Sequence, residues 1–125
     1  MKAKPGVKVA VLGATPKEDR YSFKAVRLLK QKGFQPIPVH PAGHTVDGIK
    51  GLKSLNDIAD PIDTVTVYVG SKISDGETDN IIKLNPRRVV FNPGAENSAL
   101  GTFLEGEGIE VVENCTLVML NSGIF

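Results

Sequence analysis

This sequence has no tryptophan, one cysteine, and no apolar run long enough to cross a membrane. A single cysteine cannot build an internal disulfide framework, so the sequence favours the cytoplasm over a secretory compartment. A transmembrane helix needs about 20 consecutive apolar residues and is excluded. The short lysine-containing start leads into a strand-like segment rather than the apolar centre of a signal peptide. We therefore expect a cytoplasmic protein without a membrane partner.

The size and composition predict one ordinary globular domain. The chain has 125 residues, of which 41% are hydrophobic and 23% are charged, which excludes disordered and fibrous classes. A folded protein of this size buries about two thirds of the surface of its extended chain, enough for a core without disulfides or metal ions. We expect residues 1–6 to form an N-terminal tail and residues 7–125 to form the domain.

The net charge of +1 conceals two halves of opposite sign. Residues 1–53 contain eleven Lys and Arg against three acids, a net +8, and residues 54–125 contain four against eleven, a net −7. A general nucleic-acid binder tends to be basic overall, so no nucleic-acid partner is expected. The basic half suits an anionic ligand, and a chance dipole between two solvated surfaces explains the asymmetry equally well.

Segments with strand and helix patterns alternate along the chain. Short β-branched, apolar runs predict strands, and apolar stripes with helical spacing predict helices between them. Ser22 is expected to cap a helix that Gly33 ends, and residues 114–120 fit either a helical turn or an extended tail. The predicted strands are 7–12, 34–39, 64–69, 89–91 and 109–112, and the predicted helical segments are 23–32, 54–58, 71–84 and 99–107.

This alternation predicts an α/β protein with a central parallel sheet covered on both faces. In such a sheet, ligands bind beyond the carboxyl ends of the strands, where the winding reverses. The sequence therefore nominates the loops that follow the predicted strands, which are residues 13–22, 40–44, 68–72, 92–97 and 113–116.

The loop 13–22 is the strongest candidate for a ligand site. It leads into a helix N-terminus, where free backbone amides and the positive end of the helix dipole favour a phosphate. Lys17 and Arg20 add positive charge, and Arg can hold a phosphate through two donors at once. Ser22 supplies a further donor. The loop fits a diphosphate site, and a long turn with a capping serine and solvated charges is the alternative.

An NAD site is not indicated. The fingerprint G-x-G-x-x-G is missing, because no glycine follows Gly13 before Gly33. His40 stands at the end of the second predicted strand, where NAD-binding domains carry an acid for the ribose hydroxyls. A ribose that bears a phosphate suits His40, with Lys50 or Lys53 nearby, better than an unmodified ribose.

Six short motifs at the predicted strand ends carry a resemblance to a known family. They are Gly13–Pro16 with Arg20–Ser22, Pro38–Pro41, Asp63–Val65, Tyr68–Gly70, Phe91–Asn97 and Cys115–Leu120. Through them residues 7–125 resemble the small stand-alone CoA-binding domain proteins, which are related to the N-terminal domain of the succinyl-CoA synthetase α subunit. The resemblance implies a Rossmann-like, doubly wound sheet of about five parallel strands that binds coenzyme A or acyl-CoA. The first loop would take the phosphates, and the later loops would frame adenosine and pantetheine.

The matching motifs, with the loop analysis, give the candidate cofactor-binding residues. Family members commonly have Asn where this chain has His40, which concerns the ribose-phosphate contact. Tyr68 is expected to stack on adenine or to be half-buried in the core, and Asn92 and Asn97 to hydrogen-bond the ligand or to serve turns and caps. The full set is Gly13, Ala14, Thr15, Lys17, Arg20, Tyr21, Ser22, His40, Pro41, Tyr68, Val69, Gly70, Asn92, Pro93, Gly94 and Asn97.

The sequence favours a non-catalytic binding protein. The synthetase carries its phosphorylated histidine in a second domain that has no counterpart here, and no nucleophile–base pair is apparent. His40 and His44 have no third ligand at metal-binding spacing, so no metal is expected. Cys115 is the one reactive candidate, as a thiol near pantetheine or as a buried small hydrophobe. A CoA-linked redox protein acting through Cys115, an NAD(P)-binding oxidoreductase-type domain, and a homodimer or partner protein stay open as alternatives.

Overall fold

Strands and helices alternate along the chain, as predicted. The computed structural model describes residues 1–125. The elements are β1 (Lys8–Leu12), α1 (Tyr21–Gln31), β2 (Gln35–Val39), the 3-10 turn η1 (Leu55–Asp57), β3 (Thr64–Val67), α2 (Ser71–Asp75), α3 (Thr78–Leu84), β4 (Arg88–Phe91), α4 (Ser98–Gly106), β5 (Glu110–Glu113) and α5 (Thr116–Asn121). None of these helices has the length and hydropathy that a membrane-spanning segment requires.

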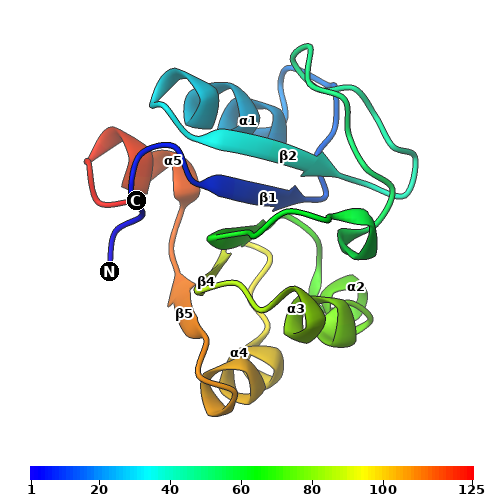
Figure 1. The fold of residues 1–125 in the computed structure, drawn as a ribbon, viewed down its shortest axis with the longest axis vertical. Coiled ribbons are helices and arrows are strands. Elements are labelled where there is room, and N and C mark those ends of the chain that lie inside the picture. Colours follow the sequence, from blue (N-terminus) through cyan, green and yellow to red (C-terminus); the bar gives the residue numbers. More distant parts are fainter.

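The five strands form one sheet in the order β2-β1-β3-β4-β5, and every pair is parallel (Figure 1). The chain winds outward from β1 to β2, and then returns across β1 to β3 and continues to β5. The winding therefore reverses between β1 and β3. The carboxyl ends of these two strands flank the crevice where ligands bind in open α/β sheets.

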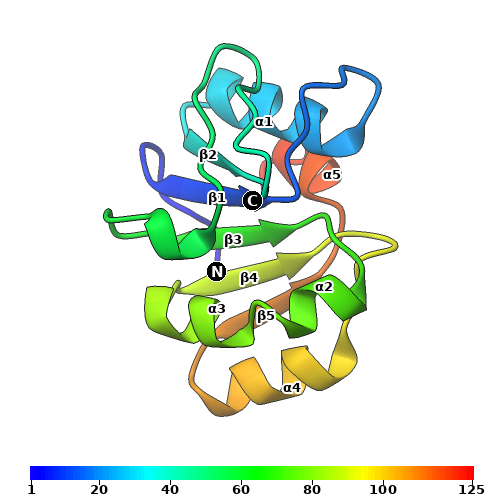
Figure 2. The same ribbon diagram turned by 90° about the vertical axis from the view of Figure 1, so that its right-hand side faces the viewer.

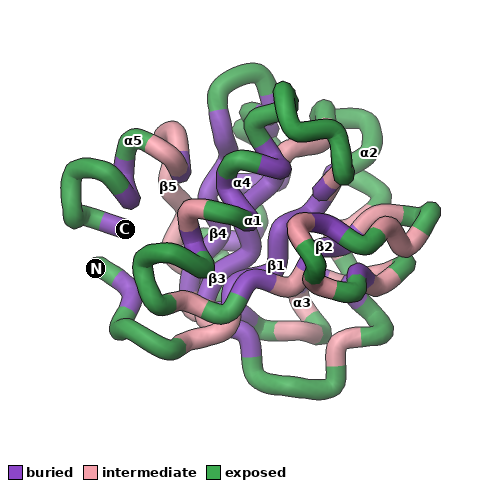
Figure 3. Tube along the Cα trace, turned by 90° about the horizontal axis from the view of Figure 1, so that it is seen from above, coloured by how far each residue is buried: buried purple, intermediate pink, exposed green.

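Each face of the sheet is covered by its own helices. Successive strand residues point to opposite faces, so β1 contributes Val9 and Val11 to one face and Ala10 and Leu12 to the other. The first pair packs with residues of α1 and α5, and the second pair packs with residues of α3 and α4. In Figure 3 the strands β1, β3 and β4 are buried at the centre, the edge strand β5 is mostly intermediate, and most connecting loops are exposed. The Rossmann-like, doubly wound α/β fold expected from the sequence is confirmed.

The first helix begins earlier than predicted. Its first residue is Tyr21 and its N-cap is Arg20, which makes no side-chain capping hydrogen bond. The prediction that Ser22 caps this helix is wrong, because Ser22 lies inside the first turn and is only 4% exposed. The helix N-terminus is consequently left without a side-chain cap.

Two other predicted elements have different bounds. The single helix predicted over 71–84 is divided into α2 and α3, because Gly76 ends the first helix and Glu77 precedes the second. The predicted strand 64–69 ends at Val67. Residues 114–120, for which two conformations were open, contain the start and most of α5.

The two ends of the chain lie beside each other (Figure 1). The backbone amide of Ala3 donates to the carbonyl of Phe125 at 2.7 Å, and both residues are buried. The ammonium group of Met1 forms an ion pair with Glu110 at 2.9 Å. Residues 1–6, which the sequence suggests as a tail, therefore pack against the C-terminal residues and the edge strand β5.

The strand order also separates the charges in space. Residues 1–53, with net charge +8, form β1, α1, β2 and the following loop at one end of the sheet. Residues 54–125, with net charge −7, form β3, β4, β5 and the helices α2, α3 and α4 at the other end, while α5, which packs against α1, contains no charged residue. The asymmetry read from the sequence is thus an asymmetry of the folded molecule.

Candidate functional site

A cleft of about 400 Å³ lies at the carboxyl edge of the sheet, where the winding reverses. The loops after β1 and β4 project beyond the strand ends on this side of the molecule (Figure 2). Nine of the sixteen residues predicted from the sequence line the cleft, together with Ala95, which the prediction omitted although it stands in a quoted motif. The lining consists of Gly13, Thr15, Lys17, Arg20, Tyr21, Ser22, Tyr68, Pro93, Gly94 and Ala95.

Gly13 makes the wall of the cleft possible. Its φ is +93°, which favours glycine, and a Cβ placed on it would lie 2.7 Å from Cγ1 of Val69 and 3.3 Å from the carbonyl carbon of Tyr68. The loops after β1 and β3 therefore approach each other more closely than any other residue at position 13 allows. Val69 shapes the site from behind and does not line the cleft.

The first amides of loop 13–22 are occupied. The backbone amides of Gly13 and Ala14 donate to the carbonyl of Val39, at 2.8 and 3.2 Å, and Ala14 is completely buried. These bonds fasten the end of β1 to the end of β2. The amides open to a ligand are instead those of the first turn of α1, because its first i to i−4 bond runs from Lys24 to Arg20.

Two cations stand at this helix N-terminus without an acidic partner. Lys17 and Arg20 both line the cleft, and neither takes part in any of the ion pairs of the protein. By contrast, Arg27 and Lys30 farther along α1 both pair with Asp47 at 2.9 Å. Positive charge at the cleft is therefore free to meet an anion.

Tyr68 lines the cleft, but its hydroxyl points into the protein. The oxygen is buried and forms no hydrogen bond of good geometry, although the hydroxyls of Thr66 and Thr116 lie close enough to affect it. Burial raises the pKa of the Tyr68 phenol well above its usual value, and so keeps it neutral. The ring can contact a ligand only through the part exposed to the cleft.

Asn92 does not line the cleft but hydrogen-bonds to the strand end and the helix start next to it. Its side chain is buried, donating to Oγ1 of Thr66 at 2.7 Å and to the carbonyl of Val67 at 2.9 Å. Its Oδ1 accepts from the amide of Thr116 at 2.8 Å, and Oγ1 of Thr66 and Oγ1 of Thr116 are 2.8 Å apart. This network joins β3, β4 and the start of α5. All of its polar contacts lie within the protein.

Asn97 also has internal partners. Its Oδ1 accepts from the amide of Leu100 at 3.1 Å and caps α4, while its Nδ2 donates to Ser74 and Asp75 of α2. Gly70 is the N-cap of the short helix α2 and lies outside the cleft lining. Both residues stabilise the loops around the cleft and do not themselves line it.

His40 and Pro41 lie in the loop after β2 and do not line the cleft. The imidazole of His40 stacks on His44 with 4.6 Å between ring centroids, and its Nδ1 accepts from the amide of Ala42 at 3.0 Å. Partial burial, and secondarily the neighbouring His44, lower the pKa of His40. Sequence spacing suggested no such stack, since it depends on how the loop closes.

Cys115 is the N-cap residue of α5 and is partly exposed. It does not line the cleft. Of the two alternatives for Cys115, a buried small hydrophobe does not agree with this partial exposure, and the thiol is not part of the cleft lining.

A match to a family model agrees with the first loop, the strand-end motifs and the cleft. Residues 7–121 match the family model described as CoA binding domain. The chain belongs to the CoA-binding domain family. The resemblance expected from the six motifs is thereby confirmed.

Several relatives of this CoA-binding domain are known. An uncharacterized protein, YneT, from Bacillus subtilis is 27% identical over 105 residues, covering 84% of this chain and 78% of that protein. A crystal structure of an uncharacterized protein superposes with a TM-score of 0.92 and 39% identity, over 98% of this chain and all of that one. A Thermus thermophilus protein superposes with a TM-score of 0.87 and 26% identity, over 96% of this chain and 91% of that one.

The same fold forms part of a larger enzyme. A dinucleotide-forming acetyl-coenzyme A synthetase from Candidatus Korarchaeum cryptofilum, solved with phosphate and ADP, superposes with a TM-score of 0.74 and 21% identity. The match covers 88% of this chain and 26% of the synthetase. At this identity the likeness concerns the fold alone.

Proposed function

We propose that this protein binds coenzyme A or acyl-CoA without catalysing a reaction, with the pyrophosphate of the ligand at the N-terminus of α1. The family match supports coenzyme A as the ligand. The cleft supports a binding role, because its lining contains no histidine, cysteine or carboxylate that could form a nucleophile–base pair. A cytoplasmic location accords with this ligand and with the single cysteine.

One observation carries the proposal: the eleven-residue helix α1 begins in the cleft without a side-chain cap, and Lys17 and Arg20, which precede it, form no ion pair. The helices α4 and α5 have a side-chain acceptor at their start, whereas the short helices α2 and α3, like α1, have no side-chain cap. Asn97 caps α4, and Asn92 accepts from the first amide of α5. Free amides, the helix dipole and cationic side chains at one point form a suitable environment for a phosphate group.

The surrounding residues suit the rest of the ligand. Gly13 and Gly94 leave the cleft walls without side chains, so that a backbone and a phosphate can approach closely. Tyr21, which is 69% exposed at the cleft, and the exposed edge of Tyr68 offer aromatic surface for a base or for the pantetheine chain. We place the adenosine toward the end of β2, as in other doubly wound sheets.

Calorimetric titration with CoA, dephospho-CoA, ADP and NAD tests the proposal. We expect CoA to bind more tightly than dephospho-CoA, and NAD to bind weakly, because no acid stands at the end of β2 for its ribose hydroxyls. Arg20→Ala should weaken CoA binding by about 1–3 kcal/mol, the contribution of a charged hydrogen bond.

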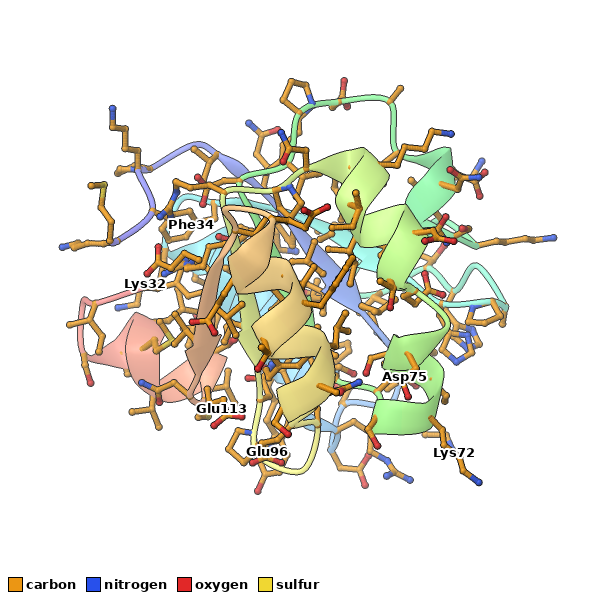
Figure 4. All side chains as sticks on the ribbon, turned by 90° about the horizontal axis from the view of Figure 1, so that it is seen from below. Lys32, Phe34, Lys72, Asp75, Glu96 and Glu113 are labelled. Carbon is orange, nitrogen blue, oxygen red and sulfur yellow. The ribbon has the colours of Figure 1, made fainter.

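Lys32→Ala is the matched control for Arg20→Ala. Lys32 is the C-cap residue of α1, whereas Arg20 is its N-cap residue, so the two cations stand at opposite ends of the helix. Figure 4 shows Lys32 on the opposite side of the molecule from Lys72 of α2. Removing its charge changes the net charge equally but should leave the affinity for CoA unchanged. An equal loss in both variants would reduce the role of Arg20 to general electrostatics, and no affinity for CoA in the unaltered protein would refute the proposed function.

A further inference from the structure

The loop after β2, residues 40–53, contains a pair of histidines whose geometry depends on their being neutral. The Nδ1 atom of His40 accepts a hydrogen bond from the amide of Ala42 at 3.0 Å, which only an unprotonated nitrogen can do. The ring of His44 stacks on it with 4.6 Å between centroids, so that protonating both would place two like charges together. The pair is therefore sensitive to a proton or to an approaching anion.

This loop lies next to the start of the cleft. The carbonyl of Val39, which immediately precedes His40, accepts from the amides of both Gly13 and Ala14. A parallel bridge between Val39 and Leu52 closes the loop, and the amide of His40 donates to Leu52. His40 thus occupies a fixed position one peptide away from the loop that leads to α1.

No acid neutralises the histidine pair. His44 is the titratable group that faces His40, and the side chain of Lys53 lies along the same turn, against Gly43. Asp47, the one acid of the loop, is held by Arg27 and Lys30 of α1 at 2.9 Å. Neither histidine forms an ion pair, and neither does Lys50 or Lys53. The loop has cationic capacity without a counter-ion.

We propose that His40 and His44 form a proton-linked subsite for a phosphomonoester on the ribose of the ligand, so that the protein binds CoA more tightly as the pH falls. This inference rests on the proposed function and names the feature of the ligand that the loop distinguishes. A bound phosphate favours the imidazolium form, which releases Nδ1 from Ala42 and turns both ring nitrogens into donors. Histidine changes charge between about pH 5 and pH 8, where this linkage operates.

The sign of the effect follows from linkage. A phosphate that raises the pKa of an imidazole strengthens binding below the pKa of the free protein, and the gain is lost as the pH rises through the pKa of the complex. A shift of one unit corresponds to a tenfold change in affinity. Between about pH 8 and about pH 5.5 we therefore expect the affinity for CoA to rise about tenfold more than in a variant that lacks the pair.

The test compares the protein with the double variant His40→Asn, His44→Gln in titrations with CoA and with dephospho-CoA at several pH values. Asn at position 40 keeps an oxygen that can accept from Ala42, so the turn is retained without a titratable ring. The phosphate of CoA itself titrates near pH 6, and the titration of free CoA contributes the same pH dependence to both proteins, so that the difference between them reports on the histidine pair. Dephospho-CoA should show the same pH dependence with both proteins.

A nuclear magnetic resonance titration of the two imidazoles provides an independent readout in the unaltered protein. CoA should raise the pKa of at least one ring, and dephospho-CoA should not. An equal pH dependence of CoA binding in both proteins, or unmoved imidazole pKa values, would overturn the inference while leaving the proposed function in place. Failure of CoA to bind at any pH would overturn both.

Discussion

The guanidinium of Arg88 lies 4.3 Å from the centroid of the Phe125 ring and donates through Nη1 to the carbonyl of Phe125 at 2.8 Å. Arg88 is 1% exposed, its Nε donates to Thr64, and its Nη2 has no partner. Burial is the main cause that lowers the pKa of this guanidinium from its very high ordinary value. The C-terminal residue therefore covers a buried cation and supplies part of its compensation.

Phe125→Ala should lower the free energy of unfolding by about 3 kcal/mol, because it removes a buried ring and uncovers Arg88. The ring also packs edge-on against Phe34, with 5.4 Å between centroids. Ile124→Ala is the control, since Ile124 is 52% exposed and should cost less than about 0.5 kcal/mol. Urea denaturation of both variants measures the difference, and equal midpoints would contradict the role given to Phe125.

Gly13→Ala and Gly94→Ala separate backbone strain from collision. Both glycines have a positive φ, +93° and +86°, but a Cβ at Gly94 meets nothing within 4 Å. Gly94→Ala should therefore cost only the strain, about 1–2 kcal/mol. Gly13→Ala should cost about 1–3 kcal/mol more, because its Cβ collides with Val69. Thermal denaturation compares the two, and a Gly13 variant as stable as the Gly94 variant would show that the loops can separate freely.

Asn92→Ala should destabilise the protein by about 3 kcal/mol, since it leaves the amide of Thr116 and the hydroxyl of Thr66 with fewer partners in a buried site. Asn121→Ala, at an exposed position in α5, is the control with the same change of side chain. Hydrogen exchange should also show faster opening of α5 in the Asn92 variant. Unchanged protection of α5 would mean that this network does not hold the helix.

Asp47 should contribute to stability through its carboxylate. Hydrogen bonds from Arg27 and then Lys30 are the main causes that lower its pKa to about 2, against about 3.9 in an unfolded chain. Because the folded pKa is the lower one, the contribution is present above about pH 4 and is lost as the pH falls toward 2.

Denaturation of Asp47→Asn across this pH range should show a lower stability at neutral pH and a flatter acid dependence than the unaltered protein. Asn tolerates the φ of +49° found at Asp47, so the loop is preserved. Asp19→Asn, which removes an acid outside every ion pair, should leave the acid dependence nearly unchanged. The same slope in the Asp47 variant would contradict the assignment.

The order of the elements could be predicted from the sequence because local signals dominate it. The β-branched run 64–67 and the stripe of α1 each bury a continuous face, so their periodicity survives into the fold. The start of α1 was placed wrongly because a serine resembles a cap in sequence, whereas packing buries Ser22 and puts Arg20 at the boundary.

The sequence predicted the loops after β1, β3 and β4 that form the cleft, whereas His40 and Asn92, which directly follow β2 and β4, do not line it. Gly13, Tyr68, Pro93 and Gly94 all line it, since parallel strands end at one edge. The sequence could not predict which residues line the cleft and which only hold the surrounding loops in place. Asn92 and Asn97 differ from the lining residues only in the direction of their side chains, which tertiary packing decides.

The unequal charges at the two ends of the sheet affect how a ligand arrives. A polyanion far from the molecule experiences a field directed along the strand order, attractive near β2 and repulsive near β5. For the proposed ligand we therefore expect encounters to be guided toward the end where α1 begins, and the association rate to fall as added salt shortens the range of the field. The strand order thus determines from which side a polyanion approaches the protein before any contact is made.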